Sequence, residues 1–509
     1  MLARAHTFTI DGLQVRPVAV EVDIRPGLPA FSIIGLADAP VREARERVRA
    51  AILNSGYEFP ARRITANLAP ADVPKAGPGL DLALACAILA ASGQTSSERL
   101  ASHALLGELA LDGELRPSHG ALAVAMAAAQ AGLARLVLAR SQARRAALVQ
   151  GIEVAPAASL KSALRILAGG VADGAPALAA NRQMPPDAAR GRAGPDLGEV
   201  KGQHHAVQAL ILAAAGAHNL LLSGPPGTGK TMLANRLASI LPPLSAQEAI
   251  EVTRIYALAG LGERLARKRP FRAPHHSISM AGLVGGSQRS WVGEVVLAHQ
   301  GVLFLDELSE FARPALEALR QPLEEGRLAI VRARGAAVYP ARFMLVAATN
   351  PCPCGYAGDG DRCDCGESEL ARHRRRLSGP LLDRIDLLVH LHREHDLHAG
   401  ALTTTRRARE RVLLARERQA ARLAGEGVLV NAAMDAAALR RHVSLDERGD
   451  DLLRRAGAQG MLSARGQHRV LRVARTIADL EASPRVRAAH LGAALAMRPE
   501  VGLHGSRAA

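Results

Sequence analysis

Residues Gly224–Thr231 read Gly-Pro-Pro-Gly-Thr-Gly-Lys-Thr and fit the phosphate-binding loop pattern G-x-x-x-x-G-K-S/T. The apolar run Leu220–Ser223 before the loop predicts a buried parallel strand, and Thr231–Leu241 after it has helical periodicity. In this setting the glycines let successive backbone N–H groups and the helix N-terminus point at phosphate oxygens. The stretch predicts an α/β fold with a parallel sheet, built around a nucleotide phosphate site.

The loop residues have separate expected roles in holding ATP. Lys230 is expected to reach the β- and γ-phosphates, and the Thr231 hydroxyl is expected to ligate Mg²⁺. The remaining residues are expected to line the nucleotide: Gly224, Pro225, Pro226, Gly227, Thr228 and Gly229.

Two further predicted strands end in polar side chains that suit ATP hydrolysis. Val302–Leu305 leads into Asp306 and Glu307. Asp306 can hold Mg²⁺ through water, and Glu307 can polarise the attacking water as general base. Phe343–Ala348 leads into Thr349 and Asn350, whose amide can orient that water. Acids often follow apolar strands, but together with the phosphate loop they predict an ATPase.

Bulk composition is that of a globular protein of several domains. The chain has 509 residues, of which 48% are hydrophobic and 22% charged. No apolar stretch approaches the roughly 20 residues that a membrane span needs. The first ten residues lack the charged and apolar regions of a signal peptide. We therefore expect a cytoplasmic protein with no membrane partner.

The net charge of +16 suggests that the protein binds a polyanion such as nucleic acid. Only five of the 64 basic residues are lysines, which looks like a genome-wide bias toward arginine and weakens that argument. Aromatic residues make up 2% of the chain, so a base-stacking platform is not expected. A grip on nucleic acid should be on phosphates.

Composition divides the chain into four parts. Residues 1–168 alternate short strands with helices, and residues 169–195 are a Gly-, Ala- and Pro-rich flexible linker. Residues 196–393 alternate strands and helices around the phosphate loop, as in a doubly wound sheet, and residues 394–509 are helical.

Several helix ends are also predicted from capping residues. Asp38 is expected to cap a helix that Asn54-Ser55-Gly56 closes. In the helical part, we expect starts at a Ser444–Glu447 capping box, at Ser463 and at Ser483-Pro484.

Two arginines are candidates for stabilising the charge that develops on the γ-phosphate. Arg384 lies in Gly379–Asp386, and Arg465 lies in Ser463–Arg472. In so arginine-rich a chain, an ordinary surface role is the alternative. The order of these features along the chain favours the role in ATP hydrolysis. AAA+ ATPases have, in this order, a phosphate loop, an acidic strand end, a polar strand end, an arginine, and an arginine in a helical lid.

Longer segments resemble the YifB/ComM family of magnesium-chelatase-like AAA+ proteins over nearly the whole chain. These segments are FRAPHHSISMAGLVGG (271–286), GVLFLDELSEF (301–311), ATNPCPCGY (348–356), LSGPLLDRIDL (377–387) and RVARTIADL (472–480). The resemblance implies that Arg384 is an arginine finger for the neighbouring subunit's nucleotide. It implies that Arg465 is the sensor-2 arginine for its own, with Arg469 and Arg472 as alternatives. A trans arginine implies a ring, most simply a homo-hexamer.

The first domain resembles the α+β fold of Lon-type proteases but lacks their Ser-Lys dyad. Gly79, within Pro74–Asp81, stands where the nucleophilic serine belongs, and Leu122 and Val124 stand where the lysine belongs. Without a hydroxyl and an amine, peptide hydrolysis by this route is excluded. An assembly role and a DNA-contacting role both stay open for this domain.

The family resemblance implies an ATP-driven motor on single-stranded and branched DNA. It would promote branch migration, extending heteroduplex during natural transformation and homologous recombination, with recombination proteins as further partners. Three alternatives are a metal-chelatase subunit, an ATP-dependent protease and a protein remodeller. The missing Ser-Lys dyad argues against the protease.

Arg327–Phe343 predicts two short strands about a turn at Arg332–Gly335. In helicase-like relatives a hairpin in this position enters the pore of the ring, where Arg332 and Arg334 could grip phosphate. A solvated hairpin tip is the alternative. His275 and His276 belong either to a second pore insertion or to packed structure.

Four cysteines form a C-x-C-x₈-C-x-C cluster: Cys352, Cys354, Cys363 and Cys365. In a cytoplasmic protein such clustering favours a metal over disulfides, and four thiolates suit tetrahedral Zn²⁺. The C-x-C spacing is tighter than that of the usual zinc knuckle. Zinc here would be structural, since no ligand position is left open. Cys86 lies alone in an apolar helix, as expected for core packing.

Overall fold

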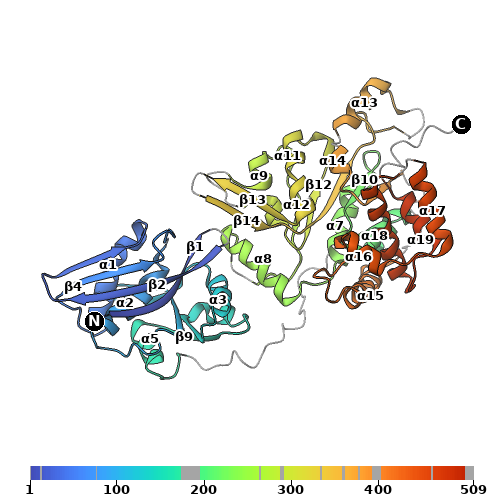
Figure 1. Cartoon of the computed structure of the whole chain (residues 1–509). Helices are drawn as coiled ribbons and strands as arrows, with labels where there is room; N and C mark the ends of the chain where they lie inside the picture. Colours follow the sequence, from blue (N-terminus) through green and yellow to red (C-terminus); the bar gives the residue numbers. More distant parts are fainter. Residues whose placement is uncertain are drawn as a thin grey trace. The chain divides into compact units, whose positions relative to one another are not determined.

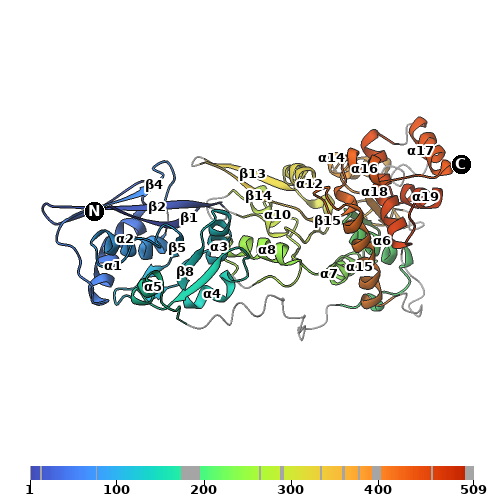
Figure 2. The same cartoon turned by 60° about the horizontal axis from the view of Figure 1, so that its bottom comes forward.

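The computed structural model describes eleven stretches of the chain: residues 2–11, 14–75, 77–173, 195–262, 265–286, 292–332, 335–357, 362–376, 379–392, 403–459 and 462–498. They form two compact units (Figures 1 and 2). The first unit comprises Met1–Ala188 and Thr253–Leu265, and the second comprises Ala189–Val252 and Ala266–Ala509. None of the helices in these stretches is both long and apolar enough to cross a membrane.

The first unit is built on a seven-stranded mixed sheet in the order β3-β4-β2-β1-β5-β8-β9. Its strands are β1 (Leu2–Asp11), β2 (Gln14–Arg25), β3 (Ala30–Ile34), β4 (Arg63–Ala69), β5 (His103–Leu106), β8 (Arg135–Ala139) and β9 (Glu153–Ala157). The pairs β1–β2 and β2–β4 are antiparallel, and the other pairs are parallel. A short hairpin is formed by β6 (Glu108–Leu109) and β7 (Leu115–Arg116).

The helices of this unit are α1 (Ala39–Asn54), α2 (Asp81–Ala91), α3 (Ala121–Gln130), α4 (Arg140–Ala146) and α5 (Leu160–Leu167). Every residue of α2 is buried: its first residue, Asp81, pairs with Arg47 over 2.8 Å, and the rest of its sequence is apolar on all sides. The predicted cap of α1 is confirmed: the Asp38 carboxylate accepts from the Val41 N–H over 2.9 Å.

The second unit contains a five-stranded parallel sheet in the order β11-β12-β15-β10-β16. Its strands are β10 (Leu220–Ser223), β11 (Phe271–Arg272), β12 (Val302–Leu305), β15 (Met344–Thr349) and β16 (Leu387–His390). The predicted α/β fold with a parallel sheet is confirmed. Ser223 pairs with Thr349, and Leu305 with Ala347, so β10, β12 and β15 end side by side.

Helices and a hairpin surround this sheet. The helices are α6 (His204–Gly216), α7 (Lys230–Ile240), α9 (Met280–Val284), α10 (Glu294–Leu297), α11 (Arg313–Ala318), α12 (Arg320–Glu325), α13 (Glu367–Arg376) and α14 (Gly379–Leu382). Helix α8 (Ala246–Leu258) is divided between the two units, with its residues from Thr253 onward in the first. The antiparallel hairpin of β13 (Arg327–Arg332) and β14 (Gly335–Pro340) matches the predicted one and extends away from the parallel sheet in both views (Figures 1 and 2).

The chain continues into five helices: α15 (Thr405–Arg422), α16 (Ala436–His442), α17 (Glu447–Ala458), α18 (Ala464–Leu480) and α19 (Ala488–Ala496). They share one apolar core with the sheet, in which Val412 and Val473 join Leu222. Polar contacts reinforce this docking, since Gln419 Nε2 donates to the Ala215 oxygen over 3.0 Å.

Two of the predicted starts in this helical part are wrong. The cap of α17 is Asp446, whose carboxylate accepts from the Gly449 N–H over 2.7 Å, and not the Ser444–Glu447 box. Helix α19 begins at Ala488, well after Ser483-Pro484. The predicted start at Ser463 is confirmed, since its hydroxyl accepts from the Gly466 N–H over 3.1 Å.

Candidate active site

The phosphate loop joins the end of β10 to the start of α7. Gly229, directly before the helix, has φ +84°, a left-handed conformation that side chains other than glycine rarely adopt. A Cβ atom at Gly224 would lie only 2.6 Å from the Leu391 oxygen, so the chain passes too close there for any side chain. Thr228 Oγ1 donates to the Pro225 oxygen over 2.8 Å and ties the turn together. Local sterics thus set the shape of the loop.

The Lys230 ammonium group occupies the centre of this loop. Its Nζ donates to the Gly224 oxygen over 2.6 Å, the Pro225 oxygen over 2.9 Å and Asn350 Oδ1 over 3.0 Å. Partial burial lowers the pKa of Lys230, and the nearby carboxylates of Asp306 and Glu307 oppose that shift. The ammonium group is partly buried and donates to three oxygen atoms, which phosphate oxygens of a bound nucleotide can replace.

Thr231 and Asp306 meet across the ends of β10 and β12. Thr231 Oγ1 donates to Asp306 Oδ2 over 2.6 Å, and the other carboxylate oxygen accepts from the Glu307 N–H over 3.0 Å. A hydroxyl and a carboxylate are hard oxygen ligands, which fit Mg²⁺ together with waters and phosphates. The two predicted Mg²⁺ residues are therefore adjacent in the structure.

Glu307 has an unusual backbone conformation. Its φ is +53°, in the left-handed region, which for a residue other than glycine costs about 1–3 kcal/mol. Its side chain is 57% exposed, and one carboxylate oxygen lies 3.2 Å from His276 Nδ1. The His276 ring lies edge-on to Phe311, with ring centroids 6.5 Å apart. The contact between His276 and Glu307 is a feature of the site that the sequence did not predict.

Asn350 lies at the end of β15 and is held on two sides. Its side chain accepts from Lys230, as described above. Its backbone oxygen accepts from Nε2 of the buried His373 of α13 over 2.9 Å. The predicted polar strand end is thus fixed against the phosphate loop and against α13.

The two candidate arginines converge on one carboxylate. Arg384 donates to Glu324 Oε1, and Arg465 Nη1 lies 3.7 Å from the same oxygen. The Arg465 side chain is 75% exposed, whereas that of Arg384 is 14% exposed. Burial lowers the pKa of Arg472, although Asp386 and Asp435 oppose the shift. Of the sensor-2 candidates, Arg465 is thus open to a ligand and Arg472 is enclosed.

Two other predicted sets of residues lie on the β13–β14 hairpin and in the loop after Asn350. Arg332 closes the β13–β14 hairpin by pairing with Gly335, and Arg334 lies outside the described residues. The sulfur atoms of Cys352, Cys354, Cys363 and Cys365 lie within 4.8 Å of one another.

In the first unit, the places expected for a protease dyad are apolar. Leu122 and Val124 are buried in the core on α3. A Cβ atom at Gly79 would lie 3.4 Å from the buried Ser118 Oγ. That hydroxyl has no hydrogen-bond partner among the described residues, so no base is in place to activate it.

Three families match successive parts of this chain. Residues 20–142 match the family described as subunit ChlI of Mg-chelatase. Residues 196–398 match magnesium chelatase, subunit ChlI, and residues 403–498 match the C-terminal part of that subunit. The magnesium-chelatase family is one of AAA+ ATPases, so the chain is an ATPase of that type, for which ATP and Mg²⁺ are the expected ligands.

Two of the relatives match nearly the whole length of this chain. It is 42% identical to the uncharacterized protein YifB of Escherichia coli, over 98% of this chain and 97% of that protein. It is also 42% identical to the competence protein ComM of Haemophilus influenzae, over 99% and 98%. A shorter match is to the Holliday junction branch migration complex subunit RuvB of Mycobacterium sp. (strain KMS). The two proteins are 30% identical over 38% of this chain and 43% of RuvB. The chain therefore belongs to the YifB/ComM family of magnesium-chelatase-like AAA+ ATPases.

Proposed function

We propose that this protein is a ring-forming, ATP-driven DNA motor that promotes branch migration during natural transformation and recombination in the cytoplasm. The observation that carries the proposal is the joining of Lys230 to Asn350 and of Thr231 to Asp306 at one sheet edge. Full-length similarity to a protein named for competence supports the biological role. Partial similarity to a branch-migration subunit supports the DNA substrate.

The residues of the sheet edge divide the work of ATP hydrolysis. Lys230 and the loop N–H groups bind phosphate oxygens, and Thr231 and Asp306 hold Mg²⁺, which neutralises phosphate charge when bound. Glu307, exposed beside them, takes the proton of the attacking water. Asn350 orients that water from the end of β15.

Replacing His276 with alanine is expected to lower kcat for ATP about tenfold while KM changes little, because Glu307 loses the partner that positions its carboxylate. His276→Gln, which can still donate a hydrogen bond, should recover part of the loss. His275→Ala is the matched control, since the His275 ring nitrogen lies 2.8 Å from Ser277 Oγ instead. An unchanged kcat in His276→Ala would remove His276 from the site.

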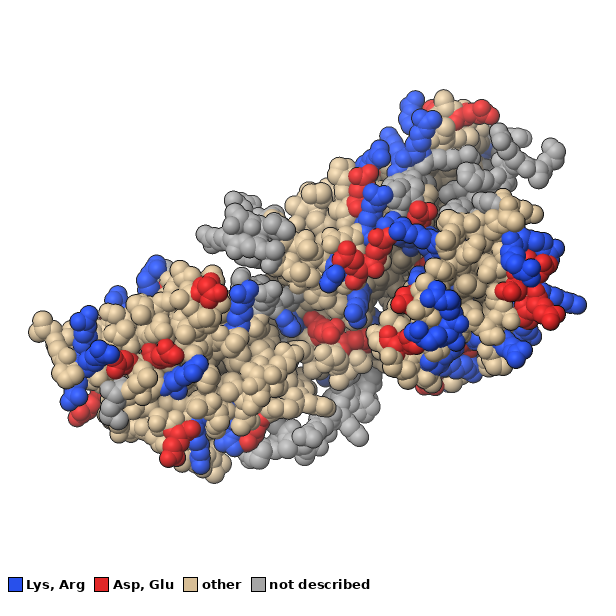
Figure 3. Space-filling model, in the orientation of Figure 1, with Lys and Arg blue, Asp and Glu red and all other residues tan. Residues whose placement is uncertain are grey.

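Phosphate contacts to DNA are assigned to the β13–β14 hairpin and to basic helices. On the face drawn in Figure 3, Lys and Arg side chains gather over the helical part of the second unit, around α13 and α15–α17, with acids interspersed. The basic side chains of this surface can contact DNA phosphates in a salt-sensitive way, and the interspersed acids would weaken that attraction.

The double replacement of Arg332 and Arg334 with alanine is expected to weaken DNA binding while basal ATP turnover is kept. If each arginine neutralises one phosphate, the salt slope for single-stranded DNA falls by about 1.4. The control removes two exposed arginines outside the hairpin and the basic helices: Arg313, which pairs with Glu317 on its own helix, and Arg25, which pairs with Asp23 on its own strand. An unchanged affinity and salt slope in the hairpin variant would refute the pore-hairpin assignment.

The experiment that tests the proposed function is ATP turnover with and without single-stranded and forked DNA. Strong stimulation by DNA is expected, followed by activity in a branch-migration assay. A rate of ATP turnover that does not change when DNA is added would favour the second candidate, a chelatase-like ATPase or a remodeller of partner proteins. That candidate is supported by the match of all three parts of the chain to magnesium chelatase subunit ChlI.

We propose that the first unit is a Lon-type protease domain that lacks the catalytic residues. Its support is the burial of the apolar Leu122 and Val124 and the lack of a hydrogen-bond partner for Ser118 Oγ among the described residues. Purified protein should show no peptide hydrolysis of its own.

A further inference from the structure

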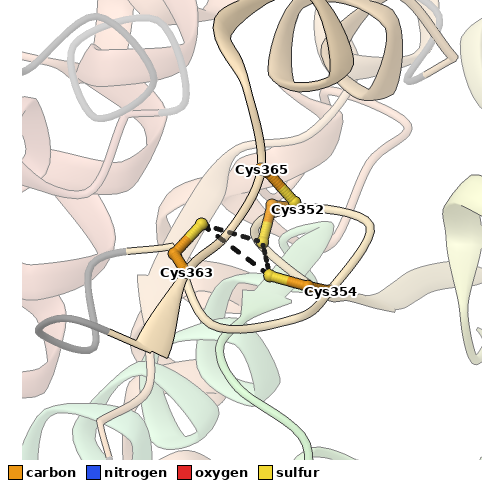
Figure 4. A group of neighbouring side chains, drawn as sticks. All are labelled: Cys352, Cys354, Cys363 and Cys365. Atoms are coloured by element: carbon orange, nitrogen blue, oxygen red, sulfur yellow. Dashed lines mark hydrogen bonds between the residues drawn. The ribbon is translucent and has the colours of Figure 1, made fainter.

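The side chains of the four cysteines point toward one another in the loop that follows Asn350 (Figure 4). Cys352 Sγ lies 3.2 Å from Cys354 Sγ and 3.8 Å from Cys363 Sγ, and Cys354 Sγ lies 3.7 Å from Cys363 Sγ. Four sulfurs in a tetrahedron around zinc, at about 2.3 Å from the ion, are about 3.8 Å apart. A disulfide would bring two sulfurs to about 2.05 Å. The observed separations fit ligands of one ion rather than disulfide bonds.

We propose that these four cysteines bind one structural Zn²⁺ ion, and that this ion holds Asn350 and the phosphate loop in their working arrangement. Four thiolates complete a tetrahedral shell and leave no position for water, as in structural zinc sites. Cys352 is buried and the other three are half-buried. The Ala357 N–H donates to Cys352 Sγ over 3.2 Å, the kind of outer contact that orients a metal ligand.

The first cysteine pair packs directly on the phosphate loop. Between Cys352 and Gly355 the chain forms a tight turn, in which the Gly355 N–H donates to the Cys352 oxygen over 3.0 Å. A Cβ atom at Gly355 would lie 2.8 Å from Cδ of Pro226 and 3.9 Å from Cγ of Asn350. The turn that carries two of the sulfurs is therefore in van der Waals contact with the loop that binds phosphate.

The second cysteine pair leads into α13, which holds Asn350 from the other side. Cys365 stands two residues before the start of α13, and His373 of that helix donates to the Asn350 oxygen. An ion shared by both pairs would join the chain before and after the segment 355–362. The described residues of 351–366 contain no α-helix or strand, so a metal is a suitable cross-link for them.

Metal content tests the site without reference to ATP. Purified full-length protein under reducing conditions is expected to carry one zinc per chain, which an organomercurial should release as four thiols react. The paired replacement Cys363→Ser and Cys365→Ser should abolish zinc binding. Cys86→Ala is the control, because Cys86 is fully buried in α2 of the first unit, so this variant should keep its zinc.

Three results would overturn the site. The first is that the protein retains no zinc after incubation with excess Zn²⁺ and desalting. The second is that the Cys363/Cys365 variant keeps as much zinc as wild type. The third is that the purified protein contains a disulfide bond within the cluster. The mercurial titration uses wild-type protein, so it decides the matter even if the cysteine variant fails to fold.

The coupling to the phosphate loop rests on the proposed ATPase function and is tested separately. Stripping zinc from wild-type protein is expected to lower ATP turnover on the order of 10²-fold, since small misplacements of a site cost that much, and added Zn²⁺ should restore it. Turnover unaffected by zinc removal would overturn the coupling. A zinc-loaded protein without any ATP turnover would instead refute the ATPase function and leave the metal site standing.

Discussion

Glu307→Gln is expected to lower ATP turnover by about 10²–10⁴-fold while nucleotide binding is retained. Glutamine has the size of glutamate, so the turn at φ +53° and the Asp306 contact to the backbone N–H can persist. What is lost is the carboxylate that accepts a proton from the attacking water. Lys230, Thr231 and Asp306, which hold phosphate and Mg²⁺, are unchanged.

Two measurements together check this expectation. Steady-state turnover should fall, and the affinity for a fluorescent ATP analogue should stay within a few-fold of wild type. Glu317→Gln is the control, because the Glu317 side chain is 42% exposed and pairs with Arg313 on the same helix, α11. A Glu307→Gln protein that still turns over ATP at the wild-type rate would require another base.

The parallel sheet of the second unit was predictable because its strands are buried on both faces. Such strands read as short apolar runs, and Leu220–Ser223 and Val302–Leu305 match β10 and β12 residue for residue. The third prediction, Phe343–Ala348, is displaced by one residue from β15. Asp306, Glu307 and Asn350 directly follow predicted strands, so predicting the strands also predicted that these residues lie at one edge of the sheet.

Helix starts were harder to predict where several capping residues compete. Ser444 and Asp446 are two residues apart, and the carboxylate of Asp446 accepts the capping bond. At Ser483, the hydroxyl donates to the Arg485 oxygen over 2.7 Å and so serves a turn instead of a helix. Short polar side chains satisfy caps and turns equally well, so the sequence alone leaves the choice open.

Contacts between segments that are distant in the sequence could not be predicted from it. His276 meets Glu307 although neither spacing nor residue type links them, and Arg384 meets Glu324 across 60 positions of the chain. Such pairs depend on how helices and loops pack around the sheet. The cysteine cluster was visible in the sequence, but its packing against Pro226 was not.

Arg384→Ala is expected to reduce ATP turnover by roughly 10³–10⁵-fold, the usual contribution of an arginine finger. A guanidinium on the γ-phosphate offsets the charge that develops in the transition state. Arg313→Ala is the control, since Arg313 is 79% exposed and pairs with Glu317 on its own helix. Because Arg384 also contacts Glu324, thermal unfolding of the variant must be compared with wild type.

Mixing subunits separates a finger that acts in trans from a merely structural arginine. In a ring of Arg384→Ala and Lys230→Ala subunits, an interface works when an intact phosphate loop meets an intact arginine. Random equimolar mixing makes about a quarter of the interfaces complete, because each is formed by two different subunits. Turnover should therefore reappear on mixing two inactive proteins. No recovery would count against a trans role.

The same mixing decides which nucleotide Arg465 serves. The family resemblance implies its own subunit's nucleotide, and Arg465→Ala mixed with Lys230→Ala would then stay inactive, since every site lacks one of its two groups. However, Arg465 and Arg384 lie at the same Glu324 carboxylate. Two guanidinium groups on one surface can reach one nucleotide together, and for a trans Arg384 that nucleotide is the neighbour's. We therefore expect the Arg465→Ala mixture to recover turnover as the Arg384→Ala mixture does.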